Sequence, residues 1–364
     1  MNTMRVITVV CWLVAALVLI GLAIWFLTGS VFGINSDRWN ININIGDWEA
    51  LTGPYEAVGV YTPGTEGINS LSVDWINGDV TVKPYDGDNF QITEFAQREL
   101  KENEKLKINT SAGTLTIKYK ESGTVLRMPQ KNLEVLVPRT LCETFNKLSA
   151  ESVSGAVTVE SINAETLSAN SISGDIKISN SVSRMLDLDT TSGSITVEFV
   201  QTDNITINSI SGEILVSDSM ANTLSCDTTS GDVGVSGAFD STRFNSISGE
   251  MSLDNSASGA TANTDSTSGS LRLSGSFSKV DTNTMSGSIS ITSKTVPDEL
   301  TVDTTSGSIK IALPNEGAVS VHYSSTSGGF TSDIPVIMQE QGAQIRISSL
   351  SGDARILALD SERE

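Results

Sequence analysis

The chain has 364 residues, a formal net charge of −20 at pH 7, 38% hydrophobic residues and 5% aromatic residues. This length allows two or three domains. Disorder is excluded despite the low aromatic content, because apolar and polar residues alternate in strict order over most of the chain. The negative charge and the scarcity of basic residues in the repeats disfavour nucleic acid and acidic polymers as partners.

The N-terminus contains a candidate membrane anchor. Val6 to Leu27 is a run of 22 residues without a charge, long enough as a helix to cross a hydrocarbon core of ~30 Å. We expect a transmembrane helix over residues 6–28, a cytoplasmic tail over residues 1–5 and a polar connector over residues 29–54. A cleaved signal peptide is the alternative, but its apolar stretch is usually about 7–15 residues. Arg5 before the helix places the N-terminus inside the cell and the bulk of the chain outside the cytoplasm.

Residues 55–148 are expected to form an N-terminal β cap. The segment Leu71 to Val82 already has the order strand, glycine, strand around Gly78. Residues 90–106 interrupt this pattern with polar and charged side chains, and the alternation returns afterwards. Repeat arrays need an atypical end unit to cover their open edge, so we expect the cap to continue into the repeats.

Residues 149–359 carry a repeated Ser-Gly pair that is followed by an apolar-polar-apolar triplet. The repeated glycines are Gly155, Gly174, Gly193, Gly212, Gly231, Gly249, Gly269, Gly287, Gly307, Gly328 and Gly352. A period near 20 residues is typical of solenoids. The alternation predicts half-buried strands on both sides of a corner, where glycine provides a positive φ and the serine hydroxyl bonds to nearby backbone.

The predicted fold is therefore all-β, a β-helix-like solenoid of ~19-residue Ser-Gly repeats behind one N-terminal transmembrane helix. Each unit buries little by itself and must stack on its neighbours. Residues 360–364 form a charged tail that suits the end of such a stack.

A second pattern repeats every two units. Asparagine and aspartate alternate at one position: Asn170, Asp189, Asn208, Asp227, Asn245, Asp265, Asn283 and Asp303. If one repeat makes one turn, each carboxylate lies between amides and is about 9.6 Å from the next carboxylate. If two repeats make one turn, aspartate stacks on aspartate. The electrostatic argument favours one repeat per turn.

We predict no catalytic, cofactor-binding or metal-binding residues and no cofactor. His322 is the one histidine and lies beside Tyr323 in a strand-like run, which disfavours a catalytic relay. The carboxylates recur at equivalent positions, which indicates a structural ladder more than a catalytic pair. The calcium-binding nonapeptide and Cys/His clusters are absent from the sequence. A polysaccharide-active enzyme is a remote alternative, and sugar binding through the Asn, Asp and Thr side chains stays open.

Cys142 and Cys226 are expected to be buried small hydrophobic residues. They are about four turns apart, or roughly 19 Å at the strand spacing, and a disulfide needs Cα atoms within about 7 Å.

Several of these motifs resemble one family. They are the Asn77-Gly78-Asp-Val-Thr-Val opening, the Leu133–Pro138 strand that ends in Val-Pro, the tandem Ser-Gly-x-Ile-x-Ile units and the final Gly342–Gly352 segment. Residues 55–359 resemble the bacterial putative-adhesin family of unknown function (DUF4097-like), which is related to the toast-rack domains. The resemblance implies a surface or periplasmic β-solenoid, in some members associated with envelope-stress systems, and no established catalytic residues.

Two functions follow as expectations. The first is a membrane-anchored, extracytoplasmic, non-catalytic module for surface adhesion or structural binding. The alternative is an envelope-stress sensor or regulator subunit that docks a membrane partner, because a cytoplasmic tail of about five residues is too short to signal by itself. The expected partners are the membrane, through the N-terminal helix, and a cell-wall component or a membrane protein. The expected location is the cell membrane, with a single pass.

Overall fold

The computed structural model describes residues 54–120, 128–143, 145–342 and 344–359. The named elements in these segments are 26 β-strands. No helix in the described part of the chain is long and apolar enough to cross a membrane. The predicted cytoplasmic tail, transmembrane helix and charged C-terminal tail lie outside the described residues, as does the connector up to residue 53, so these assignments stay predictions.

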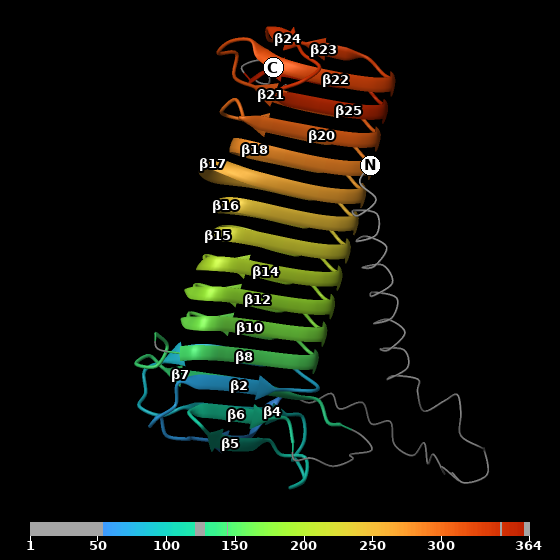
Figure 1. Ribbon diagram of the computed structural model, residues 1–364. Coiled ribbons are helices and arrows are strands. Elements are labelled where there is room, and N and C mark those ends of the chain that lie inside the picture. The colour runs from blue at the N-terminus through green and yellow to red at the C-terminus, as the bar shows by residue number, and fades with distance from the viewer. Residues whose placement is uncertain (1–53, 121–127, 144, 343, 360–364) are drawn as a thin grey trace, which may run out of the picture. The chain divides into compact units, whose positions relative to one another are not determined.

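Each repeat contributes one strand before its glycine and one strand after it, and successive repeats pair in parallel (Figure 1). The strands before the glycine are β8 (Phe145–Ser154), β10 (Ala164–Ser173), β12 (Ser183–Ser192), β14 (Gln201–Ser211), β20 (Glu299–Ser306), β22 (Val319–Ser327) and β25 (Ile345–Ser351). Those after it are β9 (Val157–Glu160), β11 (Ile176–Ser179), β13 (Ile195–Glu198), β19 (Ile289–Ser293), β21 (Ile309–Leu313), β23 (Phe330–Ser332) and β26 (Ala354–Ala358). Four long strands run from one glycine to the next and serve both ladders: β15 (Ile214–Ser230), β16 (Val233–Ser248), β17 (Met251–Ser268) and β18 (Leu271–Ser286).

One repeat makes one turn of the stack, which we call a rung. Asn170 is paired in register with Asp189, and Asp189 with Asn208, so each partner lies one repeat away. The amide of Asn208 donates to Asp189 at 2.7 Å, and the amide of Asn283 donates to Asp265 at 3.0 Å. The predicted ladder of alternating amides and carboxylates is therefore confirmed.

The core lies between the two ladders. Inward-facing residues on both sides of the glycine are fully buried, as Leu186, Leu188, Ile195 and Val197 show with 0% exposure. They join one continuous hydrophobic cluster that runs through the stack. Full burial of such a side chain contributes about 1.5–3 kcal/mol, and the alternation in sequence supplies the same face in every rung.

The repeated glycines form a column that we call the glycine corner. Gly212 has a φ of +128°, and a Cβ on it would lie 2.0 Å from the carbonyl oxygen of Gly193 in the rung below. Both the conformation and the close backbone approach require glycine there. The predicted hydroxyl bond comes from two residues before the serine: Ser246 Oγ donates to the carbonyl of Ser248 at 3.1 Å. The serine of the pair supplies the acceptor.

In the N-terminal region, the first rung in the sequence is not the outermost rung of the stack but lies one rung inside it. Its strands are β1 (Glu56–Tyr61), β2 (Ser70–Asp74), β3 (Val80–Tyr85), β4 (Gln91–Ala96), β5 (Lys107–Ser111), β6 (Thr114–Lys118) and β7 (Lys131–Pro138). The rung made by β2 and β3 lies between the rung of β6 and β7 and that of β8 and β9. Antiparallel β5 and β4 then cover β6 and β7, and β1 pairs with β4.

Strand β4 falls in residues 90–106, where the sequence predicted only a polar interruption. That interpretation was wrong because Ile92, Thr93 and Glu94 are all buried. A strand that is buried on both faces does not show alternation. The buried Glu94 has its partner, Lys131, inside the cap, as described below.

The C-terminal end has a matching arrangement. Strands β25 and β26 pair on one side with β20 and β21, and on the other with β22 and β23. The last rung in the sequence thus lies inside the outermost rung, and β24 (Val336–Met338) pairs with β22. At each end of the stack, the rung that comes first or last in the described sequence is therefore hydrogen-bonded on two edges, which opposes fraying.

Candidate functional site

Each rung has a second corner, which connects the strand after the glycine to the strand before the next glycine. Four residues one repeat apart have left-handed backbone there: Ser161, Asn180, Phe199 and Asp218, with φ of 55°, 52°, 54° and 49°. Asparagine and aspartate tolerate this conformation because their short side chains bond locally. Phe199 has no such compensation, and a left-handed L-residue costs about 1–2 kcal/mol. Phe199 is 59% exposed.

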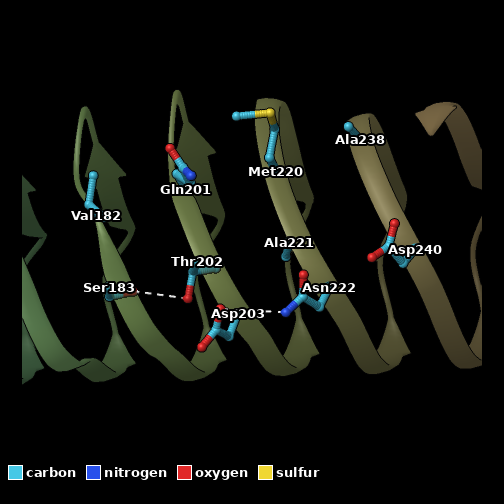
Figure 2. Close-up of a pocket in the computed structure, with 10 residues that line it drawn as sticks. All are labelled: Val182, Ser183, Gln201, Thr202, Asp203, Met220, Ala221, Asn222, Ala238 and Asp240. Carbon is cyan, nitrogen blue, oxygen red and sulfur yellow. Dashed lines mark hydrogen bonds between the residues drawn. The ribbon is translucent and has the colours of Figure 1, made fainter.

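Beside this corner lies an open groove of about 370 Å³. It is lined by Val182, Ser183, Gln201, Thr202, Asp203, Met220, Ala221, Asn222, Ala238 and Asp240. These residues come from neighbouring rungs, so the groove runs across the strands (Figure 2). The stacking register alone brings them together.

The side chains of the groove form rows along the stack. In one row Val182 pairs with Gln201, and Gln201 with Met220. In another, Asn222 donates to Asp203 at 3.4 Å, and Asp240 follows beyond it (Figure 2). The groove therefore presents apolar groups beside amide and carboxylate groups.

The groove ends where the repeat length changes. The parallel register shifts between Val216 and Ser219, and Gly237 then stands opposite Ser219. Gly237 has a φ of +154°, which differs from the values of 49–55° at the four earlier corner residues. The column of left-handed residues therefore ends at Asp218. The next register shifts lie between Gly237 and Ser241. The irregular part of the array thus adjoins the groove.

A patch of exposed apolar side chains borders the groove. Met220 is 49% exposed and Val182 is 48% exposed, and Phe199 lies two residues before Gln201 in the rung between them. We call Val182, Phe199 and Met220 the apolar patch. Exposed apolar groups that gather in one place mark interaction surfaces more often than scattered ones do.

A buried polar cluster in the cap is the other unusual site. Lys131 and Glu94 are both 0% exposed, and Lys131 Nζ lies 2.5 Å from Glu94 Oε1. The ammonium group also donates to the carbonyls of Glu104 and Tyr119 and lies 4.1 Å from the centre of the Tyr119 ring. Trp75 Nε1 donates to the carbonyl of Lys131 at 2.8 Å.

We interpret this cluster as a buried ion pair that stabilises the cap. Burial lowers the pKa of Lys131 and raises the pKa of Glu94, but three oxygen acceptors match the three protons of an ammonium group. We therefore assign an ion pair. The pair links β7 to β4. Through its hydrogen bonds to the carbonyls of Glu104 and Tyr119, Lys131 also links β7 to the segments around these two residues. Without Lys131, the buried Glu94 would lack a counter-charge.

The structure also places the residues that the sequence analysis weighed for chemistry. His322 Nδ1 lies 3.1 Å from the carbonyl oxygen of Gln339. Cys142 and Cys226 are free and buried, as predicted, with 6% and 0% exposure; burial raises the pKa of the Cys142 thiol to about 11. In the described segments, no three His, Cys, Asp or Glu residues are placed to hold a metal ion.

Sequence reasoning missed the groove and one further device. Aspartates directly after a glycine accept a hydrogen bond from a backbone N–H of the neighbouring rung: Asp175 from Ser194 at 2.8 Å and Asp353 from Gly329 at 2.7 Å.

The signal for the apolar patch was present in the repeats. Phenylalanine stands at a position where the aligned units carry Ser, Asn or Asp, and this difference would have singled it out.

The stacked rungs with glycine corners define a β-solenoid of about ten turns, and the model of the Toastrack DUF4097 family matches residues 68–238 and 205–357. The chain belongs to this family. The two matches overlap and together cover residues 68–357, which include the cap from β2 onward and the repeats. Comparison with curated proteins gave no match.

The solved structures that match the chain are distant from it in sequence. A putative adhesin from Parabacteroides distasonis ATCC 8503 is 13% identical, with a TM-score of 0.43, and the match covers 84% of this chain and 98% of that one. A putative adhesin from Parabacteroides merdae ATCC 43184 is 12% identical, with a TM-score of 0.40 and coverage of 81% and 95%. A putative lipid binding protein from Parabacteroides distasonis ATCC 8503 is 14% identical, with a TM-score of 0.36 and coverage of 84% and 97%.

Proposed function

We propose that the protein is a membrane-anchored, extracytoplasmic module that binds a component of the cell envelope without catalysing a reaction. The observation that carries this proposal is the groove with its apolar patch, because it places polar and apolar side chains on a regular hydrogen-bonded frame. The uncharged segment Val6–Leu27 supports the membrane anchor. Membership of the Toastrack DUF4097 family agrees with the proposal.

The test is co-sedimentation of the full-length protein, held in detergent micelles, with isolated cell-wall material and with membrane vesicles. Binding to either material, unchanged by a calcium chelator, supports the proposal. The same result is expected for a variant in which His322 is replaced by Gln, because this proposal gives His322 no role. Absence of binding to wall, membrane and their detergent extracts would contradict it.

A second candidate is a subunit of an envelope sensor that docks a membrane protein through the segment Val6–Leu27. The long uncharged run supports this alternative. Crosslinking in intact cells separates the two. Loss of crosslinks to a membrane protein when the order of residues 6–27 is scrambled favours the sensor, whereas unchanged crosslinks remove it.

A further inference from the structure

We propose that the groove and its apolar patch bind a cationic, amphipathic polypeptide segment. This inference rests on the proposed binding function and names the chemistry of the partner. The three observations that carry it are the backbone strain at Phe199, the exposed apolar side chains around it, and the charge of the groove.

The first observation is that the backbone conformation of Phe199 is strained and lowers the stability of the fold. Its left-handed backbone, with φ of 54°, is shared by Asn180 and Asp218 in the adjoining rungs, and those residue types suit the conformation. Phe199 gains little burial in exchange, since it is 59% exposed. Strain that the fold does not need is found most often at functional sites.

The second observation is that the rungs on either side of Phe199 also carry exposed apolar side chains, Val182 and Met220. They belong to the rungs on either side of Phe199, and each is about half exposed. The row from Val182 to Ala238 spans three rung intervals, or about 14 Å, which is the length of about four extended residues. A short peptide segment can therefore contact the whole row.

The third observation is the sign of the charge. Asp203 and Asp240 line the groove, and no lysine or arginine is among its ten lining residues. Asp218, two residues before Met220, adds an exposed carboxylate at the corner. Apolar groups flanked by carboxylates complement a segment in which leucine-like side chains alternate with lysine or arginine.

The test measures binding of a fluorescein-labelled peptide of alternating lysine and leucine to the full-length protein in detergent micelles. We expect the replacement of Phe199 by Asn to weaken binding at least about tenfold. This change keeps the net charge and relieves the backbone, so the variant should unfold at a higher denaturant concentration. Weaker binding together with higher stability cannot come from misfolding.

Three matched controls define the outcome. Met285→Asn removes an apolar side chain that is 60% exposed at the glycine corner and should change the affinity less than about twofold. The double change Asp203→Asn and Asp240→Asn should weaken binding and flatten its salt dependence, whereas Glu213→Gln, beside Gly212, should not. A peptide of alternating glutamate and leucine should not bind.

The inference is wrong if Phe199→Asn binds the cationic peptide as tightly as the native chain, because attraction would then be non-specific. It is also wrong if a neutral cello-oligosaccharide binds in the groove and competes with envelope material while the peptide does not. In either case, continued co-sedimentation with envelope material would leave the proposed function standing. The two failures are thus distinguishable.

Discussion

Gly352 lies against Gly307, although Gly328 comes between them in the sequence. A Cβ on Gly352 would be 2.0 Å from the carbonyl oxygen of Gly307, and a Cβ on Gly328 would be 2.1 Å from that of Gly352. The N–H of Gly307 donates to Ser351 at 3.2 Å, and the N–H of Gly352 donates to Ser327 at 3.0 Å. The last rung of the chain is therefore hydrogen-bonded from both sides.

We predict that Gly352→Ala destabilises the protein by at least about 3 kcal/mol, because the added methyl group meets backbone and the φ of +137° disfavours it. Gly259→Ala is the matched control. Its φ is +69°, but nothing lies within 4 Å of the added Cβ, so a loss of about 1 kcal/mol is expected. Urea denaturation measures both. Equal losses would show that backbone conformation alone, and not stacking, requires glycine at position 352.

The alternating ladder predicts a salt-dependent effect for Asn245→Asp. Asn245 donates to Asp227 and pairs in register with Asp265 in the next rung. The change would place three carboxylates in consecutive rungs about 4.8 Å apart, and we expect a loss of about 1–2 kcal/mol at low ionic strength. Raising the salt to about 1 M should restore much of it. A loss that salt does not alter would argue that the amide acts through packing.

The buried pair in the cap predicts strong non-additivity. Lys131→Met leaves the buried Glu94 without its counter-charge, and Glu94→Leu leaves the buried Lys131 without its own; each should cost about 3–5 kcal/mol. The double variant should be much closer to the native chain, because neither charge remains. Unfolding can be followed by tryptophan fluorescence, since Trp75 lies in the cap. Additive losses would remove the assignment of a direct ion pair.

Glu104 predicts acid sensitivity of the cap. Arg98 donates to both of its carboxylate oxygens, at 2.8 and 2.9 Å, and lowers the pKa of Glu104 to about 2. Because the folded pKa is below the ordinary value of 4.5, this stabilisation is fully present above pH 4.5 and is lost as the pH falls towards 2. In Glu104→Gln this part of the pH dependence should vanish. Parallel curves for the two proteins between pH 5 and pH 2 would contradict the assignment.

The sequence predicted the repeating part of the fold well because one local pattern recurs in every rung. Alternation identified the buried face and glycine identified the corner. The charges of Asp189 and Asp227 favoured one repeat per turn, which the strand register confirms. Strand β4 escaped this reasoning because its polar Thr93 and Glu94 are buried. The partners of Glu94 are Lys131 and the N–H of Leu106, which are distant in sequence, so no local pattern indicates them.

The order of the terminal rungs also could not be read from spacing, because hydrogen bonds between parallel strands do not record chain order. The sequence does contain an indication of this order: from Ile172 to Thr305, the residue two places before the glycine alternates between an apolar residue and threonine. In the stack the order is Thr305, Leu350, Thr326, which continues the alternation; the chain order breaks it. The groove was missed for a similar reason, since it depends on side chains one repeat apart.

The most direct test of the account is a footprint of methionine oxidation on the full-length protein, with and without isolated envelope material. Met220 lies in the groove and is 49% exposed, and Met285 lies at the glycine corner and is 60% exposed. Exposed methionines are oxidised to sulfoxides by peroxide, and peptide mass spectrometry reports both sites in one sample. The account predicts that envelope material slows the oxidation of Met220 several-fold and leaves Met285 unchanged. Equal rates at Met220 with and without bound envelope material would show that the groove is not the binding surface.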